Sequence, residues 1–198
     1  MRREQTLVII KPDGIQRTLI GEIIHRMERI GLKLVAMKML VPDKKQIEKH
    51  YTLDPEWIEK VGKKTIEAYK SKGQKPIDAD PLSAGKRILE ILVHYMTFGP
   101  VIAMVWQGAH SVEIVRKLVG GTEPLTSDVG TIRGDFVLDS YAIADLSGRG
   151  IRNLIHASSS VEDAKKEIDL WFEKQEIVCY RLVQEQILYD VNLDGILE

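Results

Sequence analysis

The sequence predicts an α+β domain of the ferredoxin-like type: a four-stranded antiparallel sheet in the order βαββαβ, with helices on one face. Short apolar, β-branched runs that indicate strands alternate with segments of helical periodicity. They follow one another as strand, helix, strand, helices, strand, helix, loop, strand and helix, a succession typical of this architecture. Because no repeat, low-complexity segment or linker divides the 198 residues, we expect a single domain over residues 1–198.

The first half of the chain supplies a β-α-β unit, a group of helices and a third strand. Residues 6–12 are apolar and β-branched, which predicts a buried strand, and Pro12-Asp13-Gly14 predicts a tight turn after it. An apolar stripe over 19–30 predicts a helix that Gly31 ends. By the same criteria we expect a strand over 32–42, helices over 43–51, 55–73 and 83–96, and a buried strand over 99–108.

The second half is less regular. A helix is expected at 111–121, followed by a loop at 122–136 that is rich in turn formers. Long ordered loops in compact domains are often functional. Residues 137–152 fit no element. We expect the fourth strand before a helix at 161–173, and residues 177–189 predict a further strand followed by irregular structure.

Composition argues against several classes of function. Charged residues make up 29% and the formal net charge is −1, so the overall charge indicates neither a nucleic acid nor an anionic membrane as partner. The lysine-rich stretch 60–75 is interspersed with acidic and apolar residues, which is typical of a solvated amphipathic helix and loop. Cys179 is the only cysteine, so no disulfide forms within the chain. Without a signal-peptide core or a membrane-spanning run, we expect a cytoplasmic protein.

Several residues are candidates for binding an anionic ligand. Lys11 ends the first strand just before the turn, where a solvated lysine is the alternative. Arg133 lies in the long loop, and its guanidinium matches phosphate, although a pair with Asp135 that fastens the loop is the other interpretation. Arg116 and Thr122, in and just after the helix at 111–121, are also compatible with ordinary surface.

His156 has three interpretations: a packed core histidine, a metal ligand or a nucleophile. No second histidine or cysteine lies at metal-ligand spacing from it, which argues against zinc. Ser160 is placed to cap the helix at 161–173, and a helix start favours anions. The hydroxyls of Ser158 and Ser159 are also near. A histidine beside such a site can attack or hold a phosphoryl group.

Six motifs in order connect these residues: IIKPDGIQR, KHY, GPVIAMVWQG, the arginine of EIVRKLVGGT, GTIRGDF and NLIHASSSVEDAKKEIDLWF. They closely resemble the nucleoside diphosphate kinase family over about residues 5–53, 88–136 and 152–181. The resemblance implies transfer of the γ-phosphate of a nucleoside triphosphate to a nucleoside diphosphate, by a ping-pong reaction through a phosphohistidine on His156. Neutral imidazole suits this role because it is abundant at pH 7 and needs no base to remove a proton first.

The resemblance also implies how the phosphates are bound. Lys11, Arg116 and Arg133 match the family's cationic groups around them. Tyr51 and Thr122 match neighbours of the phosphate and of the histidine. Mg²⁺ is implied as a cofactor that arrives bridging the nucleotide phosphates, so we expect no protein cage for it.

The remaining matches concern the nucleoside and the histidine. Asn153 matches the amide that reads the ribose hydroxyls together with Lys11, and Leu92 matches an apolar neighbour of the base. Ser158 and Glu167 match the pair that holds the histidine, with Glu167 bonded to its non-attacking nitrogen. The implied partners are nucleoside di- and triphosphates and further copies of the chain, in a hexamer or tetramer built from dimers.

The chain departs from the family in four respects. The usual HGSDS is HASSS here, so Ala157 replaces a glycine and Ser159 an aspartate. Two insertions are expected, at about 54–87 and 138–151, and the end YDVNLDGILE extends beyond the familiar pattern.

The fourth departure is at the base. The family stacks the base on a phenylalanine, where this chain has Ile88 or Leu89. Trp57 or Tyr69 from the first insertion is a candidate replacement, although helix core is the favoured interpretation of both.

Two other functions remain open within this fold. One alternative is a catalytically weak member of the fold that is regulatory or binds nucleic acid. The other is a phosphohistidine donor that acts on proteins. A degenerate binding module is expected to have lost part of the implied set, and this chain retains all of it: Lys11, Tyr51, Arg116, Thr122, Arg133, Asn153, His156 and Glu167.

Overall fold

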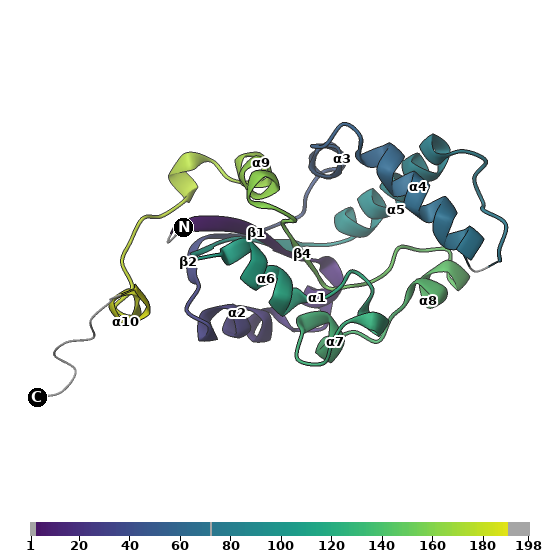
Figure 1. The fold of residues 1–198 in the computed structure, drawn as a ribbon. Coiled ribbons are helices and arrows are strands. Elements are labelled where there is room, and N and C mark those ends of the chain that lie inside the picture. Colours follow the sequence, from purple (N-terminus) through teal and green to yellow (C-terminus); the bar gives the residue numbers. More distant parts are fainter. Residues whose placement is uncertain (1–2, 72, 190–198) are drawn as a thin grey trace, which may run out of the picture.

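The computed structural model describes residues 3–71 and 73–189 and contains one antiparallel sheet (Figure 1). Its strands are β1 (Glu4–Ile10), β2 (Lys33–Leu40), β3 (Val101–Gly108) and β4 (Ile155–Ala157). They lie in the order β2-β3-β1-β4, and every neighbouring pair is antiparallel. This is the predicted ferredoxin-like arrangement, and the predicted fold class is confirmed.

The helices agree with the expected segments except in three places. The expected turn at residues 12–14 is a one-turn helix, because Pro12 has the φ that a first helical position needs. The expected loop at 122–136 contains η1 and α7, and the unassigned stretch 137–152 contains α8. The helices are α1 (Pro12–Gln16), α2 (Ile20–Arg29), α3 (Lys44–Tyr51), α4 (Trp57–Ser71), α5 (Pro81–Thr97), α6 (Ser111–Val119), α7 (Ile132–Phe136), α8 (Tyr141–Leu146), α9 (Val161–Trp171) and α10 (Gln184–Tyr189), with 3₁₀ turns η1 (Pro124–Thr126) and η2 (Lys174–Glu176).

Helices cover both faces of the sheet, so the expectation of a single covered face is wrong (Figure 1). Leu7 and Ile9 of β1 join a buried cluster with residues of α3, α5 and α9. Val8 and Ile10 join a second cluster with residues of α2 and α6. The near-continuous apolar sequence of β1 and β3 follows from this, because a strand that is covered on both faces needs apolar side chains at every position.

The expected strand at 177–189 is not formed. The chain passes the edge of β2, where Val178 N–H donates to Val35 O over 2.8 Å and Tyr180 Oη donates to Leu34 O over 2.7 Å. These two bonds do not extend into a ladder, and the chain then enters α10. The fourth strand is instead the short β4, directly before α9. No helix among the described residues is long and apolar enough to cross a membrane.

The pairing of β4 with β1 positions the candidate residues. Ile9 pairs with His156 and Ile10 with Ile155, so the histidine lies beside the end of β1 that leads to Lys11. Lys11 N–H continues the contact by donating to Leu154 O over 2.7 Å. Residues more than 140 positions apart are thereby fixed next to one another.

The first segment expected as an insertion forms α4 and the beginning of α5, which pack as a hairpin (Figure 1). Their backbones touch where glycines remove the side chains. A Cβ on Gly62 would lie 1.8 Å from Pro81 O, and a Cβ on Gly85 would lie 2.0 Å from Ile58 O. Any side chain at either position must push the two helices apart.

Gly62→Ala is therefore expected to lower the free energy of unfolding by about 1–3 kcal/mol, as overpacked sites generally do. Gly21→Ala is the matched control, because Gly21 lies in α2 with no atom within 4 Å of an added Cβ. It is expected to raise the same free energy by about 0.5–1 kcal/mol through helix propensity. Chemical denaturation measures both, and effects of the same sign would contradict the close contact.

Candidate active site

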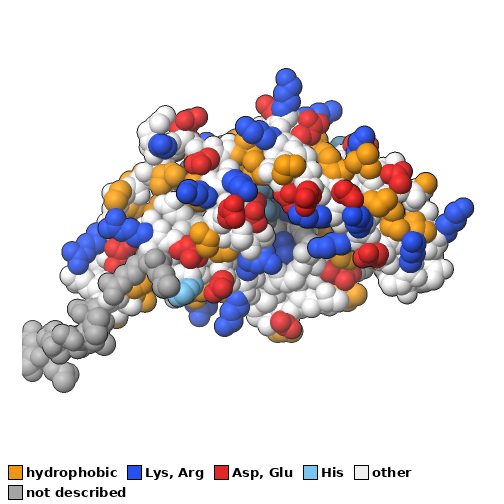
Figure 2. Space-filling view, turned by 45° about the horizontal axis from the view of Figure 1, so that its top comes forward, with side chains coloured by type: hydrophobic (Ala, Val, Ile, Leu, Met, Phe, Trp, Pro, Cys, Tyr) orange, Lys and Arg blue, Asp and Glu red, His pale blue; other side chains and the backbone are white. Residues whose placement is uncertain are grey.

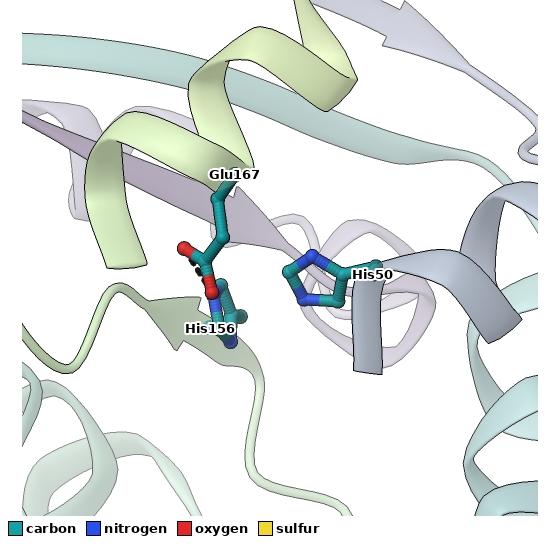
Figure 3. Close-up of side chains that lie close together, drawn as sticks. All are labelled: His50, His156 and Glu167. Carbon is teal, nitrogen blue, oxygen red and sulfur yellow. Dashed lines mark hydrogen bonds and ion pairs between the residues drawn. The ribbon is translucent and has the colours of Figure 1, made fainter. Parts of the chain in front are cut away.

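His156 is held by the carboxylate of Glu167 (Figure 3), and the hydroxyl of Ser158 holds that carboxylate in turn. Its Nε2 lies 3.1 Å from both carboxylate oxygens of Glu167 on α9. Ser158 Oγ donates to Glu167 Oε2 over 2.6 Å and accepts from the N–H of Leu7 over 3.1 Å. The helix begins where predicted, because Ser160 Oγ caps it by accepting from Asp163 N over 3.0 Å. The predicted Ser158–Glu167–His156 grouping is thus present in the structure.

The carboxylate fixes the tautomer of the histidine. An ionised carboxylate only accepts hydrogen bonds, so Nε2 of His156 carries the proton and Nδ1 keeps its lone pair. Burial opposes ionisation of Glu167, but His156 and the hydrogen bonds from His156 and Ser158 lower the pKa of Glu167 to about 2. In the described part of the chain no hydrogen bond reaches Nδ1, which points away from Glu167 (Figure 3). The arrangement therefore presents one free, basic imidazole nitrogen.

His50 packs against this imidazole and was not among the predicted site residues. Its ring lies edge-on to His156 with 4.5 Å between ring centroids (Figure 3). The indole N–H of Trp171 donates to His50 Nδ1 over 3.2 Å. Burial and the neighbouring His156 lower the pKa of His50 to about 3, so this ring is neutral at pH 7. The motif KHY contains His50 and could have indicated that this histidine belongs to the site.

His50, His156 and Glu167 offer ligand atoms within 4.8 Å of one another, which is the composition of a metal site. The hydrogen bonds argue against that use. An indole can only donate, so His50 Nδ1 accepts and Nε2 of the neutral ring carries the proton. A protonated nitrogen does not ligate a metal. His156 Nε2 is protonated as well, because it donates to the Glu167 carboxylate. The trio is better described as a histidine with two fixed neighbours.

A second group of predicted residues gathers around Asn153. Lys11 Nζ donates to Asn153 Oδ1 over 2.7 Å, and Asn153 Nδ2 donates to the backbone oxygen of Thr122 over 2.9 Å. The guanidinium of Arg133 donates to the backbone oxygens of Asn153 over 3.2 Å and Ile155 over 2.7 Å. The alternative of an Arg133–Asp135 pair does not hold, because Asp135 instead pairs with Arg26 at 2.7 Å.

Two buried cations therefore lie close to His156. Lys11 and Arg133 are 5% and 8% exposed. Burial, with the neighbouring charge of Arg133, lowers the pKa of Lys11 to about 7, although Asp13 acts in the opposite direction. Burial lowers the pKa of Arg133 to about 10. Like charges held out of water are costly unless an anion joins them, so this part of the site favours a negatively charged ligand.

The other predicted residues surround this centre. Tyr51 follows His50 on α3, and burial and then Glu167 raise the pKa of its phenol, which stays protonated. Arg116 is exposed on α6 and near enough to Arg133 to lower its pKa further. Thr122 is exposed after α6, and Leu92 is half-buried on α5. Basic side chains line a hollow on the face shown in Figure 2.

The candidate base-stacking residues lie on either side of this region. The ring of Trp57 lies 5.4 Å from that of Tyr51, with the planes tilted by 38°. Tyr69 hydrogen-bonds Asp145, which joins α4 to α8 and so joins the two segments expected as insertions. Leu89 packs against the buried cluster under α3 and α9.

Comparison with known proteins identifies the family. The nucleoside diphosphate kinase family matches residues 4–68 and 81–177. A nucleoside diphosphate kinase from Pyrobaculum aerophilum is 45% identical over 179 residues, which cover 88% of this chain and 98% of that protein. The chain belongs to the nucleoside diphosphate kinase family. It is thus an enzyme that transfers a phosphoryl group between nucleotides, and the predicted family and activity are confirmed.

Solved structures of the kinase family share this fold. The NDP kinase of P. aerophilum superposes with a TM-score of 0.86 at 44% identity, and the match covers 89% of this chain and all of that one. A transition-state mimic of the Borrelia burgdorferi kinase with bound vanadate and ADP superposes with a TM-score of 0.77 at 36% identity, covering 94% and 97% of the two chains. The unmatched residues 69–80 span the end of α4 and the connection to α5.

Glu167→Gln tests the carboxylate through acid stability. Because the folded pKa of about 2 lies below the ordinary glutamate pKa of 4.5, ionised Glu167 contributes stability above pH 4.5 that is lost as the pH falls towards 2. We expect the wild type to lose up to about 3 kcal/mol more unfolding free energy than the variant over that range. Denaturant unfolding at several pH values measures it. The control is Glu176→Gln, whose half-buried carboxylate pairs with Lys38, far from His156 in the sequence; parallel curves for wild type and Glu167→Gln would contradict the assignment.

Proposed function

We propose that His156 is the nucleophile of the kinase reaction and that the reaction proceeds in two balanced halves. The lone pair of Nδ1 attacks the γ-phosphorus of a nucleoside triphosphate. The bond from that phosphorus to the bridging oxygen breaks, and its electron pair stays on the departing nucleoside diphosphate. A second nucleoside diphosphate then attacks the phosphohistidine with a terminal oxygen, and the electron pair of the P–N bond returns to Nδ1.

One observation carries the proposal: Glu167 holds Nε2 at 3.1 Å and leaves Nδ1 as the free nitrogen, beside two buried cations. Phosphoryl transfer needs little covalent chemistry from the protein and depends on in-line positioning and charge stabilisation. The fixed ring supplies the first of these. Lys11, Arg133 and Arg116 supply the second by compensating charge on the phosphates.

Binding of the nucleoside is assigned to the group around Asn153. Its side-chain amide and the Lys11 ammonium are already bonded to each other at 2.7 Å, and both retain hydrogen-bonding capacity for ribose hydroxyls. The half-buried Leu92 is proposed as the apolar neighbour of the base. Trp57 is the aromatic candidate to lie beside it, because its ring contacts Tyr51.

Mg²⁺ is proposed as the cofactor and is expected to enter on the nucleotide. Mg²⁺ prefers oxygen ligands. The carboxylates of Glu167 and Asp13 already accept hydrogen bonds: Glu167 from His156 and Ser158, and Asp13 from Tyr95 and Leu154. The residues around His156 thus fit a metal held by the phosphates better than one held by the protein. When bound there, the ion would neutralise charge on the transferred group.

We further propose a homo-oligomer. Leu125, Val129 and Leu138, near α7, expose most of their apolar surface, and large exposed apolar groups often mark contacts with another chain. The expected hexamer or tetramer, the cytoplasmic location, and a second activity as protein phosphohistidine donor all stay predictions.

The phosphoenzyme is the decisive test. Incubation with γ-labelled ATP and magnesium is expected to give an acid-labile labelled protein that loses its label when a nucleoside diphosphate is added. His156→Ala is expected to take up no label. Tyr180→Phe is a suitable control, because its hydroxyl bonds Leu34 O at the edge of β2. A wild-type protein that never takes up label, or a His156→Ala variant that does, would refute the proposal.

Lys11 makes nucleotide binding proton-linked. With a pKa of about 7 in the free protein, Lys11 is mostly neutral at pH 8, and added phosphate charge favours its protonated form. Binding of ADP with magnesium at pH 8 is therefore expected to take up as much as about one proton, and to weaken as the pH rises further. Calorimetry in buffers of different ionisation enthalpy measures the uptake.

Lys11→Met is expected to abolish that uptake, whereas Lys38→Met, at the half-buried pair with Glu176, should retain it. The same uptake in wild type and Lys11→Met would show that another group titrates.

A further inference from the structure

A strained backbone residue lies between the two parts of the active site. Leu154 has a φ of +62°, in the left-handed region that a leucine rarely adopts. It follows Asn153 and precedes His156 by two residues, and it is fully buried. Such conformations persist only when the surrounding contacts hold them, and they are concentrated at functional sites. The question is which groups hold this one.

Asp13 holds the amide of Leu154 and also a tyrosine. Asp13 Oδ2 accepts from Leu154 N over 3.1 Å, and Asp13 Oδ1 accepts from Tyr95 Oη over 2.7 Å. On the other side of the residue, Leu154 O accepts from Lys11 N over 2.7 Å. Both backbone groups of the strained residue are therefore bound by α1 and the residue before it. Each carboxylate oxygen accepts from one of these donors, and an asparagine would replace one of the two acceptors with an NH₂ donor.

Tyr95 connects this support to the two nucleotide-binding side chains. Its Oη accepts from Asn153 N over 3.3 Å while donating to Asp13. The Lys11 ammonium lies 5.1 Å from the centre of its ring, in a cation–π contact. Burial and the Asp13 carboxylate raise the pKa of Tyr95, so its hydroxyl keeps the proton that it donates. Tyr95 thus touches both Lys11 and the backbone of Asn153 without being part of the group at His156.

We propose that Tyr95 and Asp13 form a positioning pair that fixes the Asn153–Leu154 peptide and so aims the Asn153 amide and the Lys11 ammonium at the ribose hydroxyls of the nucleotide. This inference rests on the proposed function, because it deepens the ribose-binding role of those two side chains. Neither member of the pair reacts. The pair acts through Lys11 and Asn153, while the separate contacts with Glu167 and Ser158 hold His156.

Phosphohistidine formation from two kinds of donor separates the roles. Phosphoramidate carries a phosphoryl group but no ribose, so its reaction with His156 does not use the ribose contacts that the pair positions. ATP and 3′-deoxy-ATP differ in one ribose hydroxyl, and a site that hydrogen-bonds a hydroxyl discriminates against its absence. We expect the wild type to prefer ATP over 3′-deoxy-ATP in the rate of phosphoenzyme formation.

Tyr95→Phe and Asp13→Asn are expected to reduce that preference by about tenfold, as small misplacements of binding groups do. Their rates with phosphoramidate are expected to fall less than their rates with ATP, because only the contacts of Lys11 with the phosphoryl group, and not those with the ribose, are then affected. Tyr180→Phe is the matched control and is expected to change neither, because it removes a tyrosine hydroxyl that bonds only a backbone oxygen of β2.

Each outcome is decisive. An unchanged ATP preference in either folded variant overturns the inference, as does a wild type without that preference or an equal loss of rate with all three donors. If Tyr95→Phe does not fold, Asp13→Asn answers the same question with the ring intact. If the wild type takes up phosphate from neither phosphoramidate nor ATP, it is the proposed function that fails.

Discussion

The pairing of β4 with the end of β1 is the contact on which the whole site depends. Only three residue pairs form it. Through them, His156 lies beside Ile9 and the segment before β4 lies beside Lys11. Because side chains alternate along a strand, a shift of one residue in this register would turn His156 to the opposite face of the sheet. The bonds of Asp13 to Leu154 and of Ser158 to Leu7 lie at the two ends of the short strand and oppose such a shift.

Around His156 and Asn153, polar groups that would be costly to bury form hydrogen bonds with one another. Arg133 donates to backbone oxygens after α6 and around Asn153, and it thereby joins the loop at 122–136 to β4. Glu167 is matched by a histidine and a serine. What remains uncompensated is positive charge on two buried side chains, and that remainder gives the site its preference for phosphates. The same contacts that stabilise the fold thus define the ligand.

Sequence alone predicted the sheet, most helices and the place of His156 in the candidate site, because these depend on periodicity and on motifs with a local spacing. It missed contacts made between distant segments. In the sequence, His50 is one of several scattered histidines, and only the position of α3 in the fold shows that it packs against His156. Tyr95 and Asp13 lie 82 positions apart, and nothing in either local sequence indicates that they share a hydrogen bond.

Other errors had local causes. Residues 177–189 are apolar enough for a strand, but the edge of β2 accepts only isolated bonds from them. The bounds of the fourth strand could not be predicted, because it spans only residues 155–157, too few to show an alternating pattern. The unbroken apolar runs of β1 and β3 are typical of strands covered on both faces, yet only one covered face was predicted.

The glycine contacts between α4 and α5 have a practical consequence. The backbones touch where Gly62 meets Pro81 and where Gly85 meets Ile58, so these contacts begin only after the polar connection of residues 73–80, which takes no part in them. The family match is interrupted over the same stretch. This connection, most of which is exposed, is therefore the natural attachment point for an epitope tag or a fluorescent label.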